Sequence, residues 1–308
     1  MKALVTGGSG FIGSNVTRML LERGIEVRVY DNLSSGYFEN IKDLDVEFVQ
    51  KDILDSEAVK EACRGVNVVF HLAASVGRQR SIDNPQLDSQ INLIGTVNVL
   101  EGMHLNGVKR IVYSSSAAMF GELLTPEIDE SHPQNADSPY GVSKLAAEKM
   151  ILAYTGIYDI QAICLRYFNI YGVNQRYDLY GNVIPIFAHK LFAGEPLTIY
   201  GDGTQTRDFV NVRDIARANL MAGLSDIPTN YFNMGSGSSI TINRLAEMMQ
   251  DISGIHTGTQ YLPKRKADVL HCKANATKVL DTMGFKAEVS LEEGLVQYID
   301  WYRNNIAK

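Results

Sequence analysis

The chain has 308 residues, of which 45% are apolar and 21% are charged, a composition of ordinary globular proteins that excludes disordered, collagen-like and coiled-coil classes. At about 150 residues per domain, this length predicts about two domains, or one large domain with an appended lobe. The net charge is -6 and no long basic run occurs, which argues against nucleic acid as a partner because duplex binding depends on clustered cations.

The first half of the chain alternates β-rich apolar runs with segments long enough for crossover helices. Strands are expected at 2–6, 26–30, 46–50, 66–71, 110–114 and 160–166. This alternation predicts an α/β fold, a Rossmann-type doubly wound parallel sheet with helices on both faces. After residue 172 the chain turns to loops rich in Gly, Asn and Tyr, which predicts a smaller C-terminal α/β substrate lobe. The expected division is residues 1–172, with returning elements at about 207–233, and residues 173–308.

A glycine-rich turn follows the first expected strand and opens the first expected helix. It contains Gly7, Gly10, Phe11, Ile12 and Gly13. Such glycines permit a tight turn, let backbone N–H groups approach a pyrophosphate, and let the helix pack closely on the strand. The turn therefore predicts a dinucleotide site, whereas a simple loop closure is the alternative interpretation.

Asp31 stands 18 residues after Gly13, at the end of the second expected strand. A carboxylate there accepts hydrogen bonds from an adenosine ribose and repels a 2′-phosphate. The following residues, from Asn32 to Gly36, supply no Lys or Arg to counter that charge. The predicted cofactor is therefore NAD and not NADP, with a turn-initiating aspartate as the alternative role.

Tyr140 is followed four residues later by Lys144, and Ser138 and Pro139 precede the pair as helix-starting residues. This spacing places both side chains on one helix face. A phenol has a pKa of about 10, but a nearby ammonium and a cationic nicotinamide favour phenolate; a lowering of about three units corresponds to roughly 4 kcal/mol. Serines at the end of the fifth expected strand, where ligands of such folds bind, could share the proton. An ordinary exposed helix pair is the alternative.

The three cysteines, Cys63, Cys164 and Cys272, lie far apart and form no metal-binding or redox spacing. No apolar stretch approaches the length of a membrane span, and the first residues enter a strand pattern without a signal-peptide pattern. The sequence therefore predicts reduced thiols, no metal site, no membrane contact and a cytoplasmic location.

Together these motifs resemble the extended short-chain dehydrogenase/reductase family, in particular its NAD-dependent nucleotide-sugar epimerases. The matching stretches are TGGSGFIG at 6–13, DNLSSG at 31–36, Asp52 and Ile53, HLAA at 71–74, Asn92, SSSAAMFG at 114–121, YGVSK at 140–144, RYFNIYG at 166–172 and GDGTQTRDF at 201–209. They cover nearly the whole chain. They specify the family more strongly than the sugar.

The resemblance implies a reaction and the residues that carry it. Tyr140 would be the acid/base, Ser116 its hydrogen-bonding partner, and Lys144 would hold the nicotinamide ribose and lower the tyrosine pKa. Hydride passes from sugar C4 to NAD, giving a 4-keto sugar that turns its other face before hydride returns. The implied activity is 4-epimerisation of a UDP-hexose. The small Cys272, at a position bordering the sugar's C2 substituent, implies N-acetylated sugars as well, with a buried thiol that acts only as a small hydrophobe as the alternative role.

The resemblance also implies the two binding sites. The implied cofactor residues are Gly7, Gly10, Phe11, Ile12, Gly13, Asp31, Asn32, Ser35, Gly36, Asp52, Ile53, Leu72, Ala73, Ala74, Asn92, Ser114, Tyr140, Lys144 and Tyr167. The implied UDP-sugar residues are Ser116, Asn169, Arg176, Asn182, Val183, Thr198, Tyr200, Arg207, Arg265, Asp268 and Cys272. The stretch from Arg265 to Asp268 keeps the family spacing but not its usual middle residues. Helices expected near 88–106 and 140–157 resemble those of a family homodimer interface.

Three other functions share features with this sequence. Related 4,6-dehydratases carry an Asp-Glu pair where this chain has Ala117 and Ala118, so dehydration is not expected. A UDP-glucuronate 4-epimerase or decarboxylase stays open because Arg78, Arg80 and Arg176 lie in loops near the expected pocket, with a diphosphate or surface contact as the other role for Arg176. A non-catalytic NAD-sensing protein is disfavoured by the intact serine, tyrosine and lysine.

Overall fold

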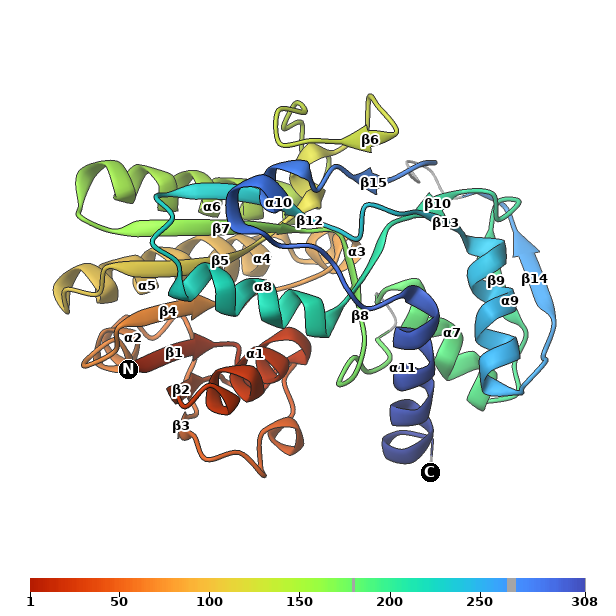
Figure 1. Ribbon diagram of the computed structural model, residues 1–308, viewed down its shortest axis with the longest axis horizontal. Coiled ribbons are helices and arrows are strands. Elements are labelled where there is room, and N and C mark those ends of the chain that lie inside the picture. Colours follow the sequence, from red (N-terminus) through yellow and green to blue (C-terminus); the bar gives the residue numbers. More distant parts are fainter. Residues whose placement is uncertain (179–180, 265–269, 308) are drawn as a thin grey trace.

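The computed structural model describes residues 1–178, 181–264 and 270–307. Within these residues the largest sheet has seven strands, all parallel, in the order β12-β7-β5-β4-β1-β2-β3 (Figure 1). The strands are β1 (Lys2–Thr6), β2 (Glu26–Tyr30), β3 (Glu47–Val49), β4 (Val68–His71), β5 (Arg110–Ser116), β7 (Gln161–Tyr167) and β12 (Asn230–Met234). The six expected strands are confirmed to within two residues at each end, and β12 adds a seventh from the later part of the chain.

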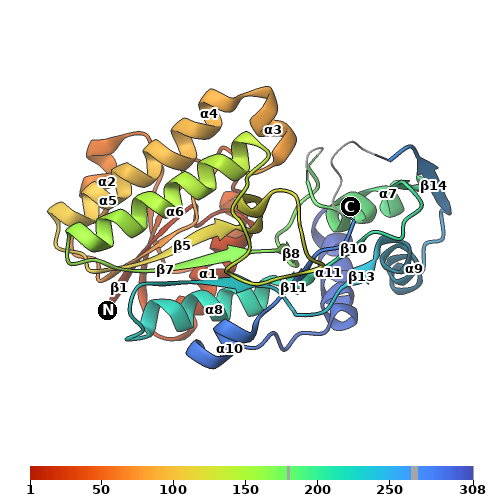
Figure 2. The ribbon, with the colours of Figure 1, turned by 90° about the horizontal axis from the view of Figure 1, so that it is seen from above.

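Helices cover both faces of the sheet, as the alternating pattern predicted (Figure 2). On one face lie α1 (Phe11–Glu22), α8 (Val212–Leu224) and α10 (Thr277–Met283). On the other lie α2 (Ser56–Ala62), α5 (Gly95–Leu105) and α6 (Pro139–Ile157). Three shorter elements, α3 (Arg78–Asp83), α4 (Pro85–Ser89) and the π-helix η2 (Gln90–Ile94), lead into α5. The doubly wound architecture is confirmed.

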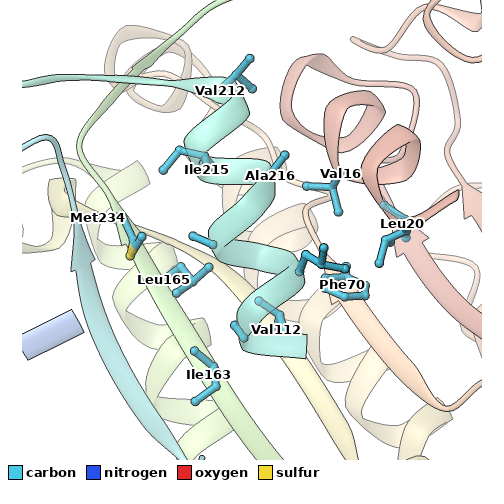
Figure 3. Packing of buried hydrophobic residues seen from close by; sticks show 14 of the residues in the cluster. Val16, Leu20, Phe70, Val112, Ile163, Leu165, Val212, Ile215, Ala216 and Met234 are labelled. Carbon is cyan, nitrogen blue, oxygen red and sulfur yellow. The ribbon is translucent and has the colours of Figure 1, made fainter. Parts of the chain in front are cut away.

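The core under α1 and α8 is built from the side chains that one face of each strand presents. Val16 of α1 and Ile215 of α8 pack with Val112 of β5 and Leu165 of β7, all fully buried (Figure 3). The neighbour of Val112, Ile111, belongs instead to the core under the opposite helices. Successive side chains of a strand point to opposite faces. A strand that is covered on both faces therefore reads as a continuous apolar run.

The C-terminal lobe has its own small core. Its elements are β8 (Asn169–Tyr171), α7 (Val183–Phe192), β9 (Leu197–Tyr200), β10 (Thr206–Arg207), β11 (Phe209–Asn211), β13 (Ile240–Thr241), α9 (Ile242–Ser253), β14 (Thr259–Leu262) and α11 (Leu291–Asn305). Phe187, Leu245 and Tyr298, from three different helices, are fully buried there. Strand β15 (Lys273–Ala274) pairs with β6 (Glu127–Ile128), which precedes α6. The lobe is thus tied to the carboxyl edge of the large sheet.

The remaining described helices are the short 3-10 turns η1 (Phe38–Asn40) and η3 (Ala117–Phe120). Among the residues that the structure describes, no helix is both long enough and apolar enough to cross a membrane.

A buried ion pair joins α6 to the sheet. Arg166 Nη2 of β7 lies 2.6 Å from Glu148 Oε1 of α6, and both side chains are 0% exposed. Ser115 Oγ of β5 donates a 2.6 Å hydrogen bond to Glu148 Oε2, and the Arg166 guanidinium lies 4.1 Å from the centre of the Tyr231 ring. The charges are compensated only while both partners are present. The pair therefore specifies one position of α6 on β5 and β7.

Replacing one partner should cost much more than breaking an exposed pair. We expect Arg166→Leu to lower the free energy of unfolding by about 3–5 kcal/mol, because Glu148 then stays buried without a cation. The control is Arg244→Leu, which breaks the exposed 3.0 Å pair with Glu247 and should cost less than about 1 kcal/mol. Urea denaturation followed by circular dichroism measures both. Equal losses in the two variants would contradict the assigned role of the pair.

Candidate functional site

The predicted catalytic residues come together at the carboxyl edge of the sheet. Ser116 ends β5 and pairs in register with Tyr167 of β7. Tyr140 stands in the first turn of α6, which begins at Pro139, and Ser138 Oγ caps it by accepting a 3.2 Å hydrogen bond from Gly141 N. The predicted helix start is confirmed. The cap fixes where the helix begins, and hence which turn carries the tyrosine.

The side chains of Tyr140 and Ser116 are neighbours, and the serine hydroxyl acts to lower the pKa of the phenol. Lys144, one helical turn further on, is 3% exposed, and its Nζ lies 4.5 Å from the centre of the Tyr113 ring. The spacing of four along α6 places the phenol and the ammonium on the same buried face. The predicted serine, tyrosine and lysine constellation is therefore present in space as well as in sequence.

Burial dominates the titration of this pair. It raises the pKa of Tyr140, which the Ser116 hydroxyl lowers only in part. It lowers the pKa of Lys144 to about 7, against the opposing effect of Asp88 and Glu148. The predicted fall of the tyrosine pKa includes the charge of a bound nicotinamide and stays a prediction. In the chain by itself, desolvation penalises the charged form of each group. A lowered pKa requires further positive charge beside the phenol.

The glycine turn has the geometry of a phosphate cradle. Gly7 has a φ of 69°, and a Cβ placed on it would lie 2.7 Å from Ala73 N. A Cβ on Gly13 would lie 2.1 Å from Gly7 O, so neither position accepts a side chain. Helix α1 starts at Phe11, followed by Ile12, and its cap residue Gly10 adds no side-chain hydrogen bond. The first N–H groups of the helix are left for an anion, which fits the pyrophosphate of NAD.

Asp31 lies against this cradle. It is 8% exposed, its Oδ2 accepts a 2.9 Å hydrogen bond from Ser9 N, and its Oδ1 accepts one of 2.8 Å from Leu33 N. Burial raises the pKa of the carboxyl, and these two backbone hydrogen bonds lower it. A Cβ on Gly36 would lie 3.0 Å from Asp31 Oδ2. The structure thus brings the end of β2 to the glycine turn, which is the arrangement expected for a ribose-binding carboxylate.

The next predicted cofactor residues follow β2 and β3. Asn32 Nδ2 donates a 2.8 Å hydrogen bond to Asp52 Oδ2, which joins the two loops. Ser35 is exposed in the first of them. Ile53 is buried and fills the space beside Gly95, where a Cβ would lie 2.7 Å from Ile53 Cγ2. These residues therefore lie in the loops that follow β2 and β3.

Two further groups of predicted cofactor residues follow β4 and β5. Leu72, Ala73 and Ala74 come directly after β4, and Ala73 N donates a 3.2 Å hydrogen bond to Thr6 Oγ1 beside the cradle. Tyr167 forms side-chain hydrogen bonds with Asn219 and Ser114, and burial raises its pKa to about 12. Both groups lie at the carboxyl ends of the central strands, as the resemblance implied.

Asn92 lies in a π-helical turn where the sequence predicted an uninterrupted helix near 88–106. Its Nδ2 donates to Asp88 Oδ1 at 3.1 Å and to Ser143 Oγ at 2.9 Å, and its Oδ1 accepts from Ser75 N at 2.8 Å. A π-helical turn inserts an extra residue into the helix and is frequent at functional sites. Here it joins α4 to α5 and turns the Asn92 amide toward α6.

The predicted UDP-sugar residues are spread over the C-terminal lobe. Asn169 Nδ2 donates a 3.0 Å hydrogen bond to Asp208 O. Asn182 caps α7 and Val183 is its first residue. Thr198 and Tyr200 lie two residues apart on β9, partly exposed. Arg265 and Asp268 lie outside the described residues.

Cys272 and Arg207 are electrostatic neighbours. Burial raises the pKa of the Cys272 thiol to about 11, and Arg207 acts in the opposite direction. Arg207 ends β10 and its Nη1 donates a 2.8 Å hydrogen bond to Thr206 O. The chain beyond Cys272 enters β15. The predicted phosphate arginine and the predicted small residue of the sugar pocket thus come from distant segments to one place.

Asp208, which no sequence motif indicated as functional, holds these segments together. It is fully buried and accepts hydrogen bonds from Ser236 Oγ at 2.6 Å, Gly237 N at 3.1 Å and Ala274 N at 3.0 Å. The sequence feature that could have indicated Asp208 is its position directly after Arg207 in the RDF stretch. That signal is weak, because charged residues are mostly exposed and nothing in the sequence shows which chain segments a carboxylate will join.

The three arginines weighed for a uronate carboxylate all have partners in the chain. Arg78 forms a 3.0 Å ion pair with Asp137, and Arg80 pairs with Asp178. The Arg176 guanidinium lies 3.7 Å from the centre of the Tyr37 ring, next to the loop that follows Asp31. These contacts direct Arg176 toward the cofactor side of the site. Arg78 and Arg80 thus have carboxylate partners within the chain, whereas Arg176 has an aromatic one.

Comparison with known proteins agrees with this geometry. The family model described as the NAD dependent epimerase/dehydratase family matches residues 3–235. A relative from Methanocaldococcus jannaschii is 38% identical over 304 residues, 98% of each chain. A UDP-glucose 4-epimerase from Mycolicibacterium smegmatis is 33% identical over 99% of each chain. A UDP-glucuronate 4-epimerase from Thermodesulfobacterium geofontis is also 33% identical, over 98% of this chain and 96% of the relative.

Solved structures show the same architecture. The UDP-glucose 4-epimerase of Thermotoga maritima with UDP-glucose has a TM-score of 0.94 at 36% identity, covering 99% of this chain and 100% of the other. A UDP-N-acetylglucosamine 4-epimerase of Methanobrevibacter ruminantium has a TM-score of 0.94 at 32% identity, covering 99% of both chains. The UDP-glucose 4-epimerase of Thermus thermophilus with NAD has a TM-score of 0.91 at 34% identity, covering 99% of this chain and 100% of the other. The chain therefore belongs to the NAD dependent epimerase/dehydratase family.

Proposed function

We propose that this protein is an NAD-dependent UDP-hexose 4-epimerase that interconverts UDP-glucose and UDP-galactose, and also their 2-acetamido counterparts. The observation that carries the proposal is the side-by-side placement of Ser116 and Tyr140 next to the buried Lys144, at the edge of the sheet that holds the glycine cradle. Ala117 and Ala118 follow Ser116, so no side-chain acid stands at the positions where the resembling dehydratases carry one. The relatives and solved neighbours that are named UDP-sugar 4-epimerases support this activity.

The residues present fit NAD. The cradle from Gly7 to Gly13 and the start of α1 would hold the pyrophosphate, Asp31 the adenosine ribose, and Lys144 the nicotinamide ribose. When bound, NAD supplies reversible oxidation at the sugar C4, because its nicotinamide ring can accept a hydride and return it. A reaction of this kind has no net redox change, so the cofactor can remain in place between turnovers.

The chain's own residues manage the proton. Tyr140 takes the proton of the C4 hydroxyl and later returns it, and Ser116 shares that proton through a hydrogen bond with the phenol. Because burial alone raises the Tyr140 pKa, the base is activated by positive charge held next to it. Lys144 supplies one such charge from the same face of α6. A cationic nicotinamide would supply another.

The nucleotide sugar would lie between the sheet edge and the C-terminal lobe. We assign Asn169, Asn182 and Val183 to the diphosphate and sugar, and Thr198 and Tyr200 to the uracil. Arg207 and Arg265 would bind the phosphates, because planar guanidinium groups suit such oxygens. Asp268 would bind the uridine ribose, and Cys272 would border the sugar. Residues 1–172, with the returning stretch at about 207–233, would bind NAD, and the rest of 173–308 would bind the nucleotide sugar.

UDP-glucuronate is the second candidate substrate. Arg176 Nε is buried and has no hydrogen-bond partner among the described residues, and the relative from Thermodesulfobacterium geofontis is named a UDP-glucuronate 4-epimerase. Against it, the Arg176 guanidinium lies on the Tyr37 ring. A substrate panel of UDP-glucose, UDP-N-acetylglucosamine and UDP-glucuronate decides between the two.

The protein would act as a homodimer in the cytoplasm. Helices α3 to α6 and the π-helix between them expose large apolar residues, namely Ile82, Leu87, Ile94, Leu105, Val142 and Ile157. An apolar surface on neighbouring helices fits a self-associating face. The three cysteines are all free thiols, which fits a reducing compartment and can be checked by cell fractionation.

Removing the proposed base should abolish most turnover. We expect Tyr140→Phe to lower kcat by at least about 100-fold, the usual scale of general acid–base catalysis, with folding and NAD binding retained because only the hydroxyl is lost. Conversion of UDP-galactose to UDP-glucose, separated by chromatography, measures the effect. Tyr154→Phe, on the same helix, is the matched control and should keep wild-type activity. A Tyr140→Phe rate within a few-fold of wild type would refute the mechanism.

Enlarging position 272 should narrow the substrate range. We expect Cys272→Tyr to suppress turnover of the 2-acetamido sugars by at least about tenfold while largely sparing UDP-glucose, because overpacking a filled pocket costs about 1–3 kcal/mol. His271→Tyr places the same ring on the exposed neighbouring residue and should spare both substrate classes. An equal loss for both classes in Cys272→Tyr, or a wild type inactive on acetamido sugars, would show that position 272 does not control access.

The apolar surface on α4 and the adjoining π-helix should control oligomeric state. Light scattering of the wild type should give twice the chain mass of 34.1 kDa. The double variant Leu87→Glu with Ile94→Glu should give the mass of one chain, because dimerisation would then bury two carboxylates of each chain in an apolar contact. Leu280→Glu, on the equally exposed surface of α10, is the control and should stay dimeric. A monomeric wild type would rule the dimer out.

A further inference from the structure

Two buried charges beside the proposed active site have no ion-pair partner. Lys144 is 3% exposed and Asp88 is 1% exposed, and neither forms a salt bridge with any residue that the structure describes. The hydrogen bonds that Asp88 accepts come from uncharged donors, Asn92 Nδ2 at 3.1 Å and Ser143 Oγ at 2.6 Å. Burying one uncompensated charge is costly, and burying two of opposite sign near each other is much less so.

The other ionisable groups around Lys144 offer it no unpaired negative charge. They are His71 of β4, Tyr113 of β5, Cys164 of β7, and Tyr140 and Glu148 of α6. Glu148 is already paired with Arg166 at 2.6 Å. Burial keeps the histidine, the tyrosines and the cysteine uncharged near neutral pH. Asp88 of α4 is the carboxylate that is left without a cation.

The position of Asp88 relative to Lys144 is fixed by Ser143. This serine directly precedes Lys144 on α6, and its hydroxyl donates to Asp88 Oδ2 while it accepts from Asn92 Nδ2 at 2.9 Å. Asn92 belongs to the π-helical turn that follows α4. The carboxylate is therefore held against the turn of α6 that carries the lysine.

We propose that Asp88 is the counter-charge of Lys144, a positioning residue that touches neither substrate nor cofactor and keeps the lysine in its ammonium form inside the buried site. The catalytic consequence rests on the proposed function, since only the ammonium form activates Tyr140. The charge pairing itself rests on the buried groups alone.

The direction of the effect follows from the two charges. Burial lowers the pKa of Lys144 to about 7, and the negative charge of Asp88 acts to raise it. Without that negative charge, the Lys144 pKa falls further, so the ammonium form is lost at a lower pH. Well below that pH, Lys144 is still protonated. A variant without the Asp88 charge should then match the wild type in the protonation state of Lys144.

The variant Asp88→Asn separates charge from hydrogen bonding. Its amide oxygen can still accept from Asn92, and its amide nitrogen can donate to Ser143 Oγ, so the network survives while the charge is lost. Ser143→Ala does the opposite, because it removes the contact and keeps the carboxylate. Asp83→Asn removes an exposed carboxylate from the neighbouring helix α3 and controls for net charge.

The direct measurement is an NMR titration of 15N-labelled lysine side chains in the NAD-loaded protein, with the Lys144 signal assigned by its absence in Lys144→Met. We expect the Lys144 midpoint to fall by about one pH unit in Asp88→Asn, the lower end of the effect of a nearby opposite charge, and to stay in place in Asp83→Asn. An unchanged midpoint in Asp88→Asn would overturn the proposal. So would an equal fall in Asp83→Asn.

A kinetic measurement tests the consequence. The alkaline limb of kcat/KM for UDP-galactose should move to lower pH in Asp88→Asn, with activity on the acid side near that of the wild type. A uniform loss at every pH would indicate a merely structural role. If Asp88→Asn does not fold, Asp88→Ser serves as the second uncharged variant. A wild type that is inactive on every UDP-hexose would contradict the proposed function. The NMR titration needs no substrate, so it would still test the charge pairing of Asp88 and Lys144.

Discussion

Helix α6 is held on the sheet by the buried pair of Glu148 and Arg166, and the proposed chemistry depends on where that helix lies. Tyr140, Lys144 and Glu148 are spaced by four residues, so the ion pair, the ammonium and the phenol share one helix face. Fixing Glu148 against β5 and β7 therefore fixes the other two. A buried pair is a poor source of net stability, but it penalises every arrangement that separates its charges. Here that penalty selects one position for the tyrosine opposite Ser116.

The same burial that fixes the helix makes the site electrostatically demanding. Desolvation raises the Tyr140 pKa and lowers that of Lys144, and each change opposes the charge state that the reaction needs. In a site of low dielectric, one added or removed charge has a large effect. Two buried carboxylates behind these groups, Asp88 and Glu148, act to raise the Lys144 pKa. The position of these acids, behind the residues that we propose to react, is thus part of the proposed chemistry.

The C-terminal lobe solves a different problem, which is to gather residues from separate loops. Arg207 and Cys272 are 65 residues apart in sequence, and they become neighbours because Asp208 binds backbone groups of Gly237 and Ala274. Strand β15, which starts after Cys272, then pairs with β6 of the other part of the chain. A single buried carboxylate thus connects the phosphate side of the expected site to its sugar side.

The sequence by itself determined the local features of this protein. Alternating and continuous apolar patterns located the six expected strands of the sheet. The glycine turn before α1 and the cap at Ser138 specified where two functional helices begin. Turns and caps can be predicted because they are set by the conformational preferences of a few adjacent residues. The spacing of Tyr140 and Lys144 likewise followed from helix geometry. Tertiary structure alone decided the features that depend on burial and on distant partners: the π-helical turn at Asn92, the pKa changes at Tyr140 and Lys144, the contact of Arg176 with Tyr37, and the buried acids Asp88 and Asp208. From sequence alone, a charged residue is predicted to be exposed. Its actual role depends on which groups the fold places around it and on how much water remains next to it.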